Sequence, residues 1–132
     1  MKSKWLLAGL VVAALSMLTA CSSLQNQVSV DESSSGKQVE IGMGGTLTVT
    51  LDSNATTGYS WELQEIGNTN VLQKTDNKYV APTSGLVGAG GKEVWNFKAF
   101  KAGKVSLSME YSQPWAGGQK GAKSFNLTVI VK

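Results

Sequence analysis

Hydrophobic and polar residues alternate with a period of two along most of the chain from residue 37 to residue 132. Such alternation is typical of β-strands that bury one face. The pattern predicts seven short strands and no amphipathic helix. The apolar positions that define these strands are Val39 and Ile41; Leu47, Val49 and Leu51; a short, poorly defined stretch between Val71 and Val80; Tyr59, Trp61 and Leu63; Trp95, Phe97 and Ala99; Val105, Leu107, Met109 and Tyr111; and Phe125, Leu127, Val129 and Val131.

Seven strands with one apolar face each predict an all-β domain, an immunoglobulin-like antiparallel β-sandwich. In an antiparallel order, consecutive loops alternate between the two ends of the sandwich. If residues 71–80 form a single strand, three long loops share one end: residues 52–58, 82–92 and 113–123. Two strands there would move the second and third of these loops to the other end. Because binding residues often lie on long loops of a rigid scaffold, we expect function at the shared end.

The first 20 residues have the pattern of a secretory signal peptide. Lys2 and Lys4 precede an uncharged, mostly apolar stretch at residues 5–18, which is too short for a flanked membrane-spanning helix. The sequence LTAC at residues 18–21 resembles a bacterial lipobox, which implies lipid modification of Cys21. The alternative is an ordinary signal peptide followed by a chance cysteine. The lipobox resemblance implies a lipid anchor in the bacterial cell envelope, and Ser22 after the cysteine favours the outer membrane, facing the periplasm or the surface.

Residues 21–36 are predicted to be the lipidated cysteine and a flexible tether, followed by the sandwich domain at residues 37–132. The fifteen residues after Cys21 are polar and serine-rich. As a flexible coil they would span about 20 Å on average. Removing residues 1–20 takes away two of the lysines, which lowers the formal net charge from +3 to +1. With no arginine and no basic cluster, the sequence does not favour a nucleic-acid partner.

The composition also argues against an enzyme. The chain has no histidine and a single cysteine, at the predicted lipidation site. Ser/His and Cys/His nucleophilic pairs and the usual zinc sites are therefore absent from the sequence. The nine acidic residues are scattered, and nothing in their spacing indicates a catalytic pair. We expect no catalytic residues, no metal and no cofactor.

Three motifs occur in order on the predicted long loops: NATTGY at residues 54–59, GAGG at residues 88–91 and QPW at residues 113–115. Together they resemble the signature loops of the chagasin family, which are inhibitors of papain-like cysteine proteases with an immunoglobulin-like fold. The resemblance extends from about residue 39 to residue 132. Two positions differ from the family pattern, because Ala55 stands where proline is usual and Gln113 stands where arginine is usual.

The resemblance implies that the three loops form a wedge that enters the protease cleft, with the threonine-rich loop nearest the catalytic cysteine. It implies a reversible, non-covalent inhibitor that acts as a monomer. The protease-binding residues that it implies are Asn54, Ala55, Thr56, Thr57, Gly58, Tyr59, Gly88, Ala89, Gly90, Gly91, Gln113, Pro114 and Trp115.

The residue types fit this role. Thr56 and Thr57 are β-branched and lose few rotamers on binding, and Gly58 tolerates a positive φ. Asn54 favours an Asx-turn onto the backbone two residues later. The GAGG segment allows close approach of a partner, or it is only a flexible connection.

Trp115 follows Pro114, which fixes the backbone before it, so its ring is either an interface anchor or a cap on the core. Trp61 and Trp95 are in phase with the strand cores and are interpreted as packing residues.

Two other functions remain open on the sequence alone. Trp115 and the glycines would also suit a cell-surface sandwich that binds carbohydrate or protein. A structural envelope lipoprotein without a soluble ligand is the third possibility. The ordered set of three loop motifs favours the inhibitor.

Overall fold

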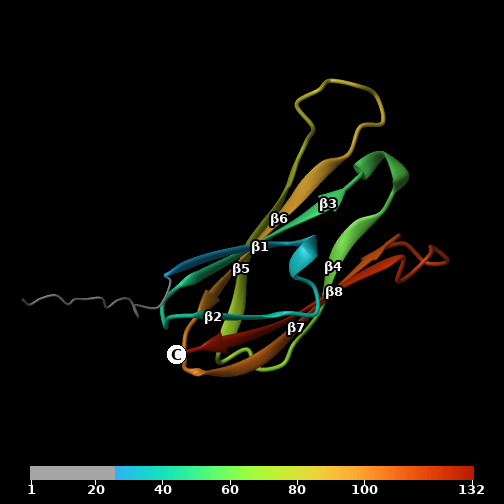
Figure 1. The fold of residues 1–132 in the computed structure, drawn as a ribbon. Coiled ribbons are helices and arrows are strands. Elements are labelled where there is room, and N and C mark those ends of the chain that lie inside the picture. Colours follow the sequence, from blue (N-terminus) through green and yellow to red (C-terminus); the bar gives the residue numbers. More distant parts are fainter. Residues whose placement is uncertain (1–25) are drawn as a thin grey trace, which may run out of the picture.

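The computed structural model describes residues 26–132, so the predicted signal peptide, Cys21 and residues 22–25 lie outside the described residues. The described residues form eight strands and two short 3₁₀ helices (Figure 1). In chain order these are β1 Gln27–Asp31, η1 Glu32–Ser34, β2 Gln38–Ile41, β3 Thr46–Ser53, η2 Ala55–Thr57, β4 Ser60–Ile66, β5 Leu72–Val80, β6 Gly91–Ala99, β7 Gly103–Ser112 and β8 Lys123–Val131. All seven predicted strands are present.

The strands form two four-stranded sheets, in the orders β1-β3-β6-β5 and β2-β8-β7-β4. The two sheets pack face to face, with the loops gathered at two ends (Figure 1). The fold is therefore an all-β immunoglobulin-like sandwich, as predicted. No helix within residues 26–132 is long and apolar enough to cross a membrane.

The core follows the period-two pattern of the sequence. On β3, Leu47, Val49 and Leu51 are fully buried, while the threonines between them are only half-buried. Phe97 on β6 and Phe125 on β8 come from opposite sheets and are also buried. Burying side chains of this size stabilises the fold by about 1.5 to 3 kcal/mol each. The predicted packing of Trp61 and Trp95 in the core is confirmed, since both are 4% exposed.

The predicted tether is wrong for residues 27–34. Residues 27–31 form β1, which pairs with β3, and residues 32–34 form η1. Only Val30 of this strand is buried, with Val28 half-buried. A single buried side chain among polar neighbours gives no strand signal, because the pairing depends on the free edge of β3 rather than on the segment's own sequence. The sandwich therefore begins about ten residues before the predicted boundary.

The prediction of purely antiparallel sheets is also wrong in part. β1 pairs with β3 and β2 pairs with β8 in parallel, while the other four pairings in the described residues are antiparallel. The cause is the crossing at η1. The chain runs up one edge of the first sheet as β1, passes through η1 to the second sheet and returns as β2 (Figure 1).

Residues 72–80 form the single long strand β5, on which the predicted arrangement of loops depends. Only Leu72 on this strand is buried, because β5 is the edge strand of its sheet. That exposure explains why the sequence defined it poorly. With one strand here, the three long connections lie at one end of the sandwich, and we call them the loop end: residues 54–59, 81–90 and 113–122. The connections at residues 42–45, 67–71 and 100–102 form the opposite end, and residues 32–37 connect β1 to β2 by crossing between the two sheets.

Candidate functional site

Direct contacts join the three loops of the loop end. The Asn54 side-chain amide donates to the carbonyl of Gly88 at 2.9 Å, which links the first loop to the second. The Tyr59 hydroxyl donates to the Gln119 side chain, which links the first loop to the third. The Trp115 ring lies over Gly58, where a Cβ atom would come within 2.5 Å of it. The predicted gathering of these loops at one end is therefore confirmed, with the first loop in the centre.

The first loop is a single 3₁₀ turn, η2, fixed by its own side chains. The Asn54 carboxamide oxygen accepts hydrogen bonds from the Thr56 N–H at 3.1 Å and from the Thr56 hydroxyl at 2.6 Å. The Thr57 hydroxyl donates to the Asn54 carbonyl at 2.7 Å. Gly58 ends the turn in the left-handed conformation, with φ +82°. The predicted Asx-turn and the predicted positive φ are both confirmed, and Ala55, Thr56 and Thr57 remain exposed at the tip.

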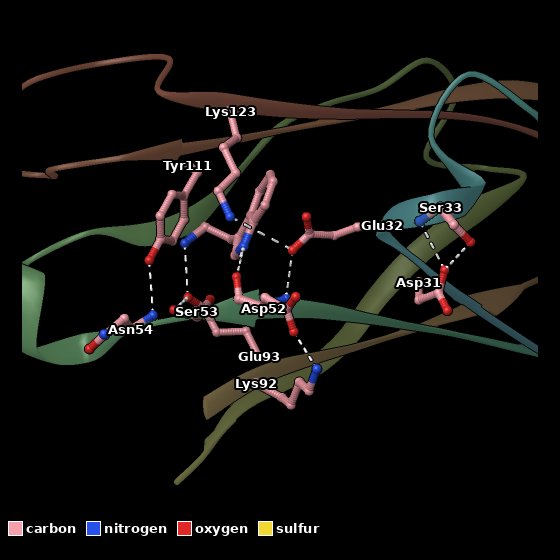
Figure 2. A network of polar contacts seen from close by, with 11 residues as sticks. Asp31, Glu32, Ser33, Asp52, Ser53, Asn54, Lys92, Glu93, Tyr111 and Lys123 are labelled. Atoms are coloured by element: carbon pink, nitrogen blue, oxygen red, sulfur yellow. Dashed lines mark hydrogen bonds and ion pairs between the residues drawn. The ribbon is translucent and has the colours of Figure 1, made fainter. Parts of the chain in front are cut away.

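Buried groups hold the base of the first loop, where β3 ends and β4 begins. One carboxylate oxygen of Glu93 accepts from the Ser53 hydroxyl at 2.7 Å and from the Trp61 N–H at 3.0 Å (Figure 2). The Trp61 indole N–H donates to the Asp52 carbonyl at 2.9 Å. Glu93 was missed in the sequence. Its signal was present as a carboxylate at an inward-facing position of the strand, in phase with Trp95.

Tyr111 supports the same loop from the other sheet. Its hydroxyl accepts from the Asn54 N–H at 2.9 Å. Its ring is stacked on Tyr59 at a centroid distance of 5.2 Å, and it also contacts the Trp61 ring at 5.1 Å. Tyr59, one of the predicted binding residues, is therefore half-buried in an aromatic cluster at the base of the loop. It supports the loop more than it forms the surface.

The segment missed as a strand also reaches the loop end. The Glu32 carboxylate, on η1, accepts from the Asp52 N–H at 2.8 Å and lies 3.9 Å from the Lys123 ammonium (Figure 2). Asp52 in turn pairs with Lys92 on the neighbouring strand, and its hydrogen bond raises the pKa of Lys92. The Ser33 hydroxyl and N–H hydrogen bonds lower the pKa of the Asp31 carboxyl nearby. These charged groups form the exposed flank of the first loop.

The second loop is the most exposed part of the site. Leu86 is 71% exposed and Val87 is fully exposed, and neither was recognised in the sequence as a candidate for binding. Gly88 has φ +81° and is exposed, as is Gly90, while Ala89 between them is half-buried. Gly91 differs, because it is buried as the first residue of β6, where a Cβ would collide with the Val80 carbonyl. That glycine serves internal packing.

The third loop closes on itself. The Gln113 N–H donates to the Gln119 carbonyl at 2.7 Å, and the Gln113 side-chain oxygen accepts from the Gln119 N–H at 2.9 Å. Gln113 therefore fixes the loop instead of projecting from it. Pro114 is exposed, and the Trp115 ring is 50% exposed and absent from the buried core. The alternative of a core-capping tryptophan does not hold.

Chemically, the loop end presents hydroxyls, backbone groups and apolar side chains, with the charged groups of the flank beside them. Within residues 26–132, no group of three or more Cys, Asp or Glu residues is placed to hold a metal ion. The site is a set of three connected loops at one end of a β-sandwich, the architecture of a binding module.

Comparisons with known proteins give the family. Residues 40–129 match the sequence model described as chagasin family peptidase inhibitor I42. Chagasin of Trypanosoma cruzi is 31% identical over 107 residues, which cover 78% of this chain and 94% of chagasin. Amoebiasin-2 of Entamoeba histolytica is 26% identical over 94 residues, which cover 71% of this chain and 76% of that protein. The chain belongs to the chagasin family, and it is a protease inhibitor rather than an enzyme.

Solved structures agree on the fold. The cysteine protease inhibitor EhICP2 of Entamoeba histolytica superposes with a TM-score of 0.69 at 20% identity, over 80% of this chain and 95% of that chain. PbICP-C, solved in complex with falcipain-2, gives a TM-score of 0.60 at 21% identity, over 87% of this chain and 96% of that chain.

Proposed function

We propose that this protein inhibits papain-like cysteine proteases reversibly, by inserting the three loops of the loop end into the active-site cleft. The observation that carries the proposal is the set of contacts that joins the loops, with Asn54 bonded to Gly88 and Trp115 seated on Gly58. Three loops fixed to one another present one surface, and a preorganised surface loses little conformational entropy on binding. The membership of the chagasin family supports the same function.

The first loop is suited to the centre of the cleft. Its tip is short, uncharged and held by hydrogen bonds within residues 54–58. The second loop would contribute apolar contacts through Leu86 and Val87, and the third loop would contribute Trp115. Aromatic residues at interfaces often supply a large share of the binding energy. The proposed contacts on the first loop are its exposed residues, Ala55, Thr56 and Thr57.

Inhibition of this kind is steric and not covalent. The hydroxyls of Thr56 and Thr57 both donate within the loop, to the side-chain oxygen and the carbonyl of Asn54. In the part of the chain that the structure describes, neither hydroxyl donates to a basic side chain that could activate it as a nucleophile, so we expect the loop to fill the cleft without a bond to the catalytic cysteine of the enzyme.

Titration of active papain with the mature chain tests the proposal. We expect stoichiometric loss of activity that recovers on dilution, while trypsin is not inhibited. Binding to a glycan array without inhibition of papain would contradict the proposal and favour the carbohydrate-binding alternative.

We further propose that a lipid on Cys21 anchors the mature protein in the bacterial envelope, at the outer membrane. β1 starts at Gln27, beside Thr46, at the end of the sandwich opposite to the loops (Figure 1). The five residues between Cys21 and β1 can span at most about 18 Å. An anchor at that position holds the opposite end toward the membrane and leaves the loop end free for a soluble protease.

The Cys21→Ser variant tests the anchor. We expect it to leave the membrane fraction and to keep both its melting temperature and its inhibition of papain, because Cys21 precedes the sandwich. Equal membrane association of the variant and the parent would contradict the anchor without affecting the proposal about inhibition.

A further inference from the structure

The buried polar residues of the sandwich all lie at the loop end. Within residues 26–132 three polar or charged residues are buried: Ser53, Glu93 and Ser112. Each lies beside one of the three loops, with Ser53 before the first, Glu93 just after the second and Ser112 just before the third. The Ser112 hydroxyl accepts from the Gly121 N–H at 3.0 Å and so holds the return of the third loop.

Glu93 is the central member of this set. It lies on β6 in one sheet and is 7% exposed, yet it binds the Trp61 backbone in the other sheet. The same oxygen binds the Ser53 hydroxyl at the end of β3. Ser53 is the last residue of β3 before the first loop, and Trp61 is the second residue of β4 after it. One carboxylate oxygen therefore fixes the distance between the two ends of that loop (Figure 2).

A buried carboxylate contributes little net stability to a β-sandwich. Removing a carboxylate from water is costly, and apolar residues of similar size often stabilise a core equally well. At the opposite end of the described sandwich, backbone hydrogen bonds such as Gly67 N–H to the Ser106 carbonyl and Phe100 N–H to the Val71 carbonyl join neighbouring segments without a buried carboxylate. The position of Glu93 therefore indicates a role in the geometry of the loop end.

We propose that Glu93, together with Tyr111, is a positioning residue for inhibition. Glu93 fixes Ser53 and Trp61, and Tyr111 fixes the Asn54 N–H at the start of the turn. Together they hold the first loop in its binding conformation before the protease arrives, which lowers the ordering cost of binding. This inference rests on the proposed inhibition, but its effect on the loop is measurable without any protease.

Two substitutions at position 93 separate the hydrogen bonds from the packing. Glu93→Gln keeps a side-chain oxygen that accepts from both donors. Glu93→Leu has similar size but leaves the Ser53 hydroxyl and the Trp61 N–H without an acceptor. We expect Glu93→Gln to stay within about threefold of the parent Ki for papain, and Glu93→Leu to raise it by about tenfold or more, because unpaired buried donors are costly.

Leu72→Ala is the control for general loss of stability. Leu72 is fully buried at the start of β5, at the opposite end of the sandwich. Its truncation lowers the melting temperature without touching the loop end. Below the melting temperatures of all variants, we expect Leu72→Ala to keep the parent Ki.

Amide hydrogen exchange supplies the readout that needs no protease. In Glu93→Leu we expect faster exchange at the Asn54 and Trp61 amides, with the Gly67 and Phe100 amides unchanged. In Leu72→Ala we expect faster exchange at the Gly67 and Phe100 amides, with the Asn54 and Trp61 amides unchanged. If the parent failed to inhibit papain, the proposed function would fall, while this exchange pattern would still decide whether Glu93 positions the loop.

Tyr111→Phe provides a second, milder variant if Glu93→Leu does not fold. It keeps the aromatic ring and removes only the acceptor of the Asn54 N–H, so we expect faster exchange at Asn54 and a raised Ki. Parent-like exchange and inhibition in Tyr111→Phe or in Glu93→Leu would overturn the proposal. The proposal would also be overturned if Glu93→Leu and Leu72→Ala raised the Ki for papain equally, or if Glu93→Leu and Glu93→Gln did so.

Discussion

The two ends of the sandwich differ in the hydrogen bonds that side chains add to them. Backbone hydrogen bonds close turns at both ends, as in Gly45 N–H to the Gly42 carbonyl at 3.0 Å and Thr57 N–H to the Asn54 carbonyl at 3.1 Å. At the loop end, side chains add hydrogen bonds between segments that are far apart in the sequence, with Asn54, Glu93 and Tyr111 each binding groups of another segment. These additional side-chain hydrogen bonds hold the longer loops in a defined conformation, which is what a surface that must fit a partner requires.

The ends share the same residue types, which makes the comparison testable by paired substitutions. Each end has an exposed threonine, a glycine at φ +82°, a half-exposed aromatic residue and at least one other exposed apolar side chain. If function lies at the loop end, the members of each pair should have similar effects on stability and different effects on inhibition.

The largest difference should come from a charge placed at each end. Thr56→Glu puts an unpaired carboxylate at the tip of the first loop, and Thr69→Glu puts the same group in an exposed turn of the opposite end. We expect Thr56→Glu to weaken inhibition of papain by about 100-fold or more, because a charge buried in an interface without a partner costs several kcal/mol. Thr69→Glu should keep a Ki for papain within about twofold of the parent. Equal inhibition by the two variants would break the comparison.

The glycine pair separates backbone strain from contact. Gly58 and Gly44 both have φ +82°, but a Cβ at Gly58 would meet the Trp115 ring, whereas a Cβ at Gly44 would meet nothing within 4 Å. Alanine at either position should cost about 1 to 2 kcal/mol of stability through strain. We expect only Gly58→Ala to raise the Ki as well, by about 30-fold, because it displaces Trp115. Thermal melts and papain titrations on both variants measure the two effects, and a raised Ki in Gly44→Ala would count against the account.

The aromatic pair is Trp115, which is 50% exposed, and Phe100, which is 47% exposed. Truncation of an aromatic anchor at an interface costs about 2 to 4 kcal/mol of binding energy. Trp115→Ala should therefore raise the Ki by about 30-fold or more with little change in melting temperature, and Phe100→Ala should leave the Ki unchanged. Trp95→Ala, in the core, should instead lower the melting temperature. A large fall in melting temperature for Trp115→Ala would show that this ring serves packing.

The smallest difference is expected for the aliphatic residues. Leu86→Ser and Val87→Ser remove apolar surface from the second loop, while Met43→Ser removes it from the opposite end. We expect about a three- to tenfold rise in Ki for the loop variants, since a peripheral aliphatic contact is worth about 1 kcal/mol. The Met43 variant should inhibit like the parent. A larger rise in Ki for Met43→Ser than for Leu86→Ser would indicate that the protease contacts the opposite end, and it would contradict the comparison.

The sequence predicted those elements whose residues carry their own pattern. The alternation on β3, β6, β7 and β8 reflects burial of one face of each strand. The predictions of these strands and of the core are therefore confirmed. β1 was missed because it has one buried residue, Val30, and depends on the free edge of β3. The parallel pairings were missed because strand direction depends on how the chain crosses between the sheets at η1, which alternation does not encode.

The site could be predicted to a similar extent. The turn at Asn54 and the positive φ of Gly58 follow from local chemistry, and both were predicted. Glu93 and Tyr111 act across the two sheets, over 32 and 57 residues of sequence, so the local pattern marks Glu93 as an inward-facing carboxylate but does not reveal the partners of either residue. Gly91 and Gln113 belong to the loop motifs, yet the structure gives both an internal role. The order of the three motifs was enough to predict the loops. Which residues project from the loops follows only from the contacts in the structure.

The most direct test is binding to a papain-like protease whose catalytic cysteine has been changed to alanine. If rigid loops block the cleft sterically, the mature chain should bind this protease about as tightly as the active one, as measured by calorimetry. After long incubation with active enzyme, intact chain should be recovered. Loss of binding to the alanine protease, or cleavage within residues 54–59 in step with inhibition, would contradict the account, because the first loop would then act as a slow substrate.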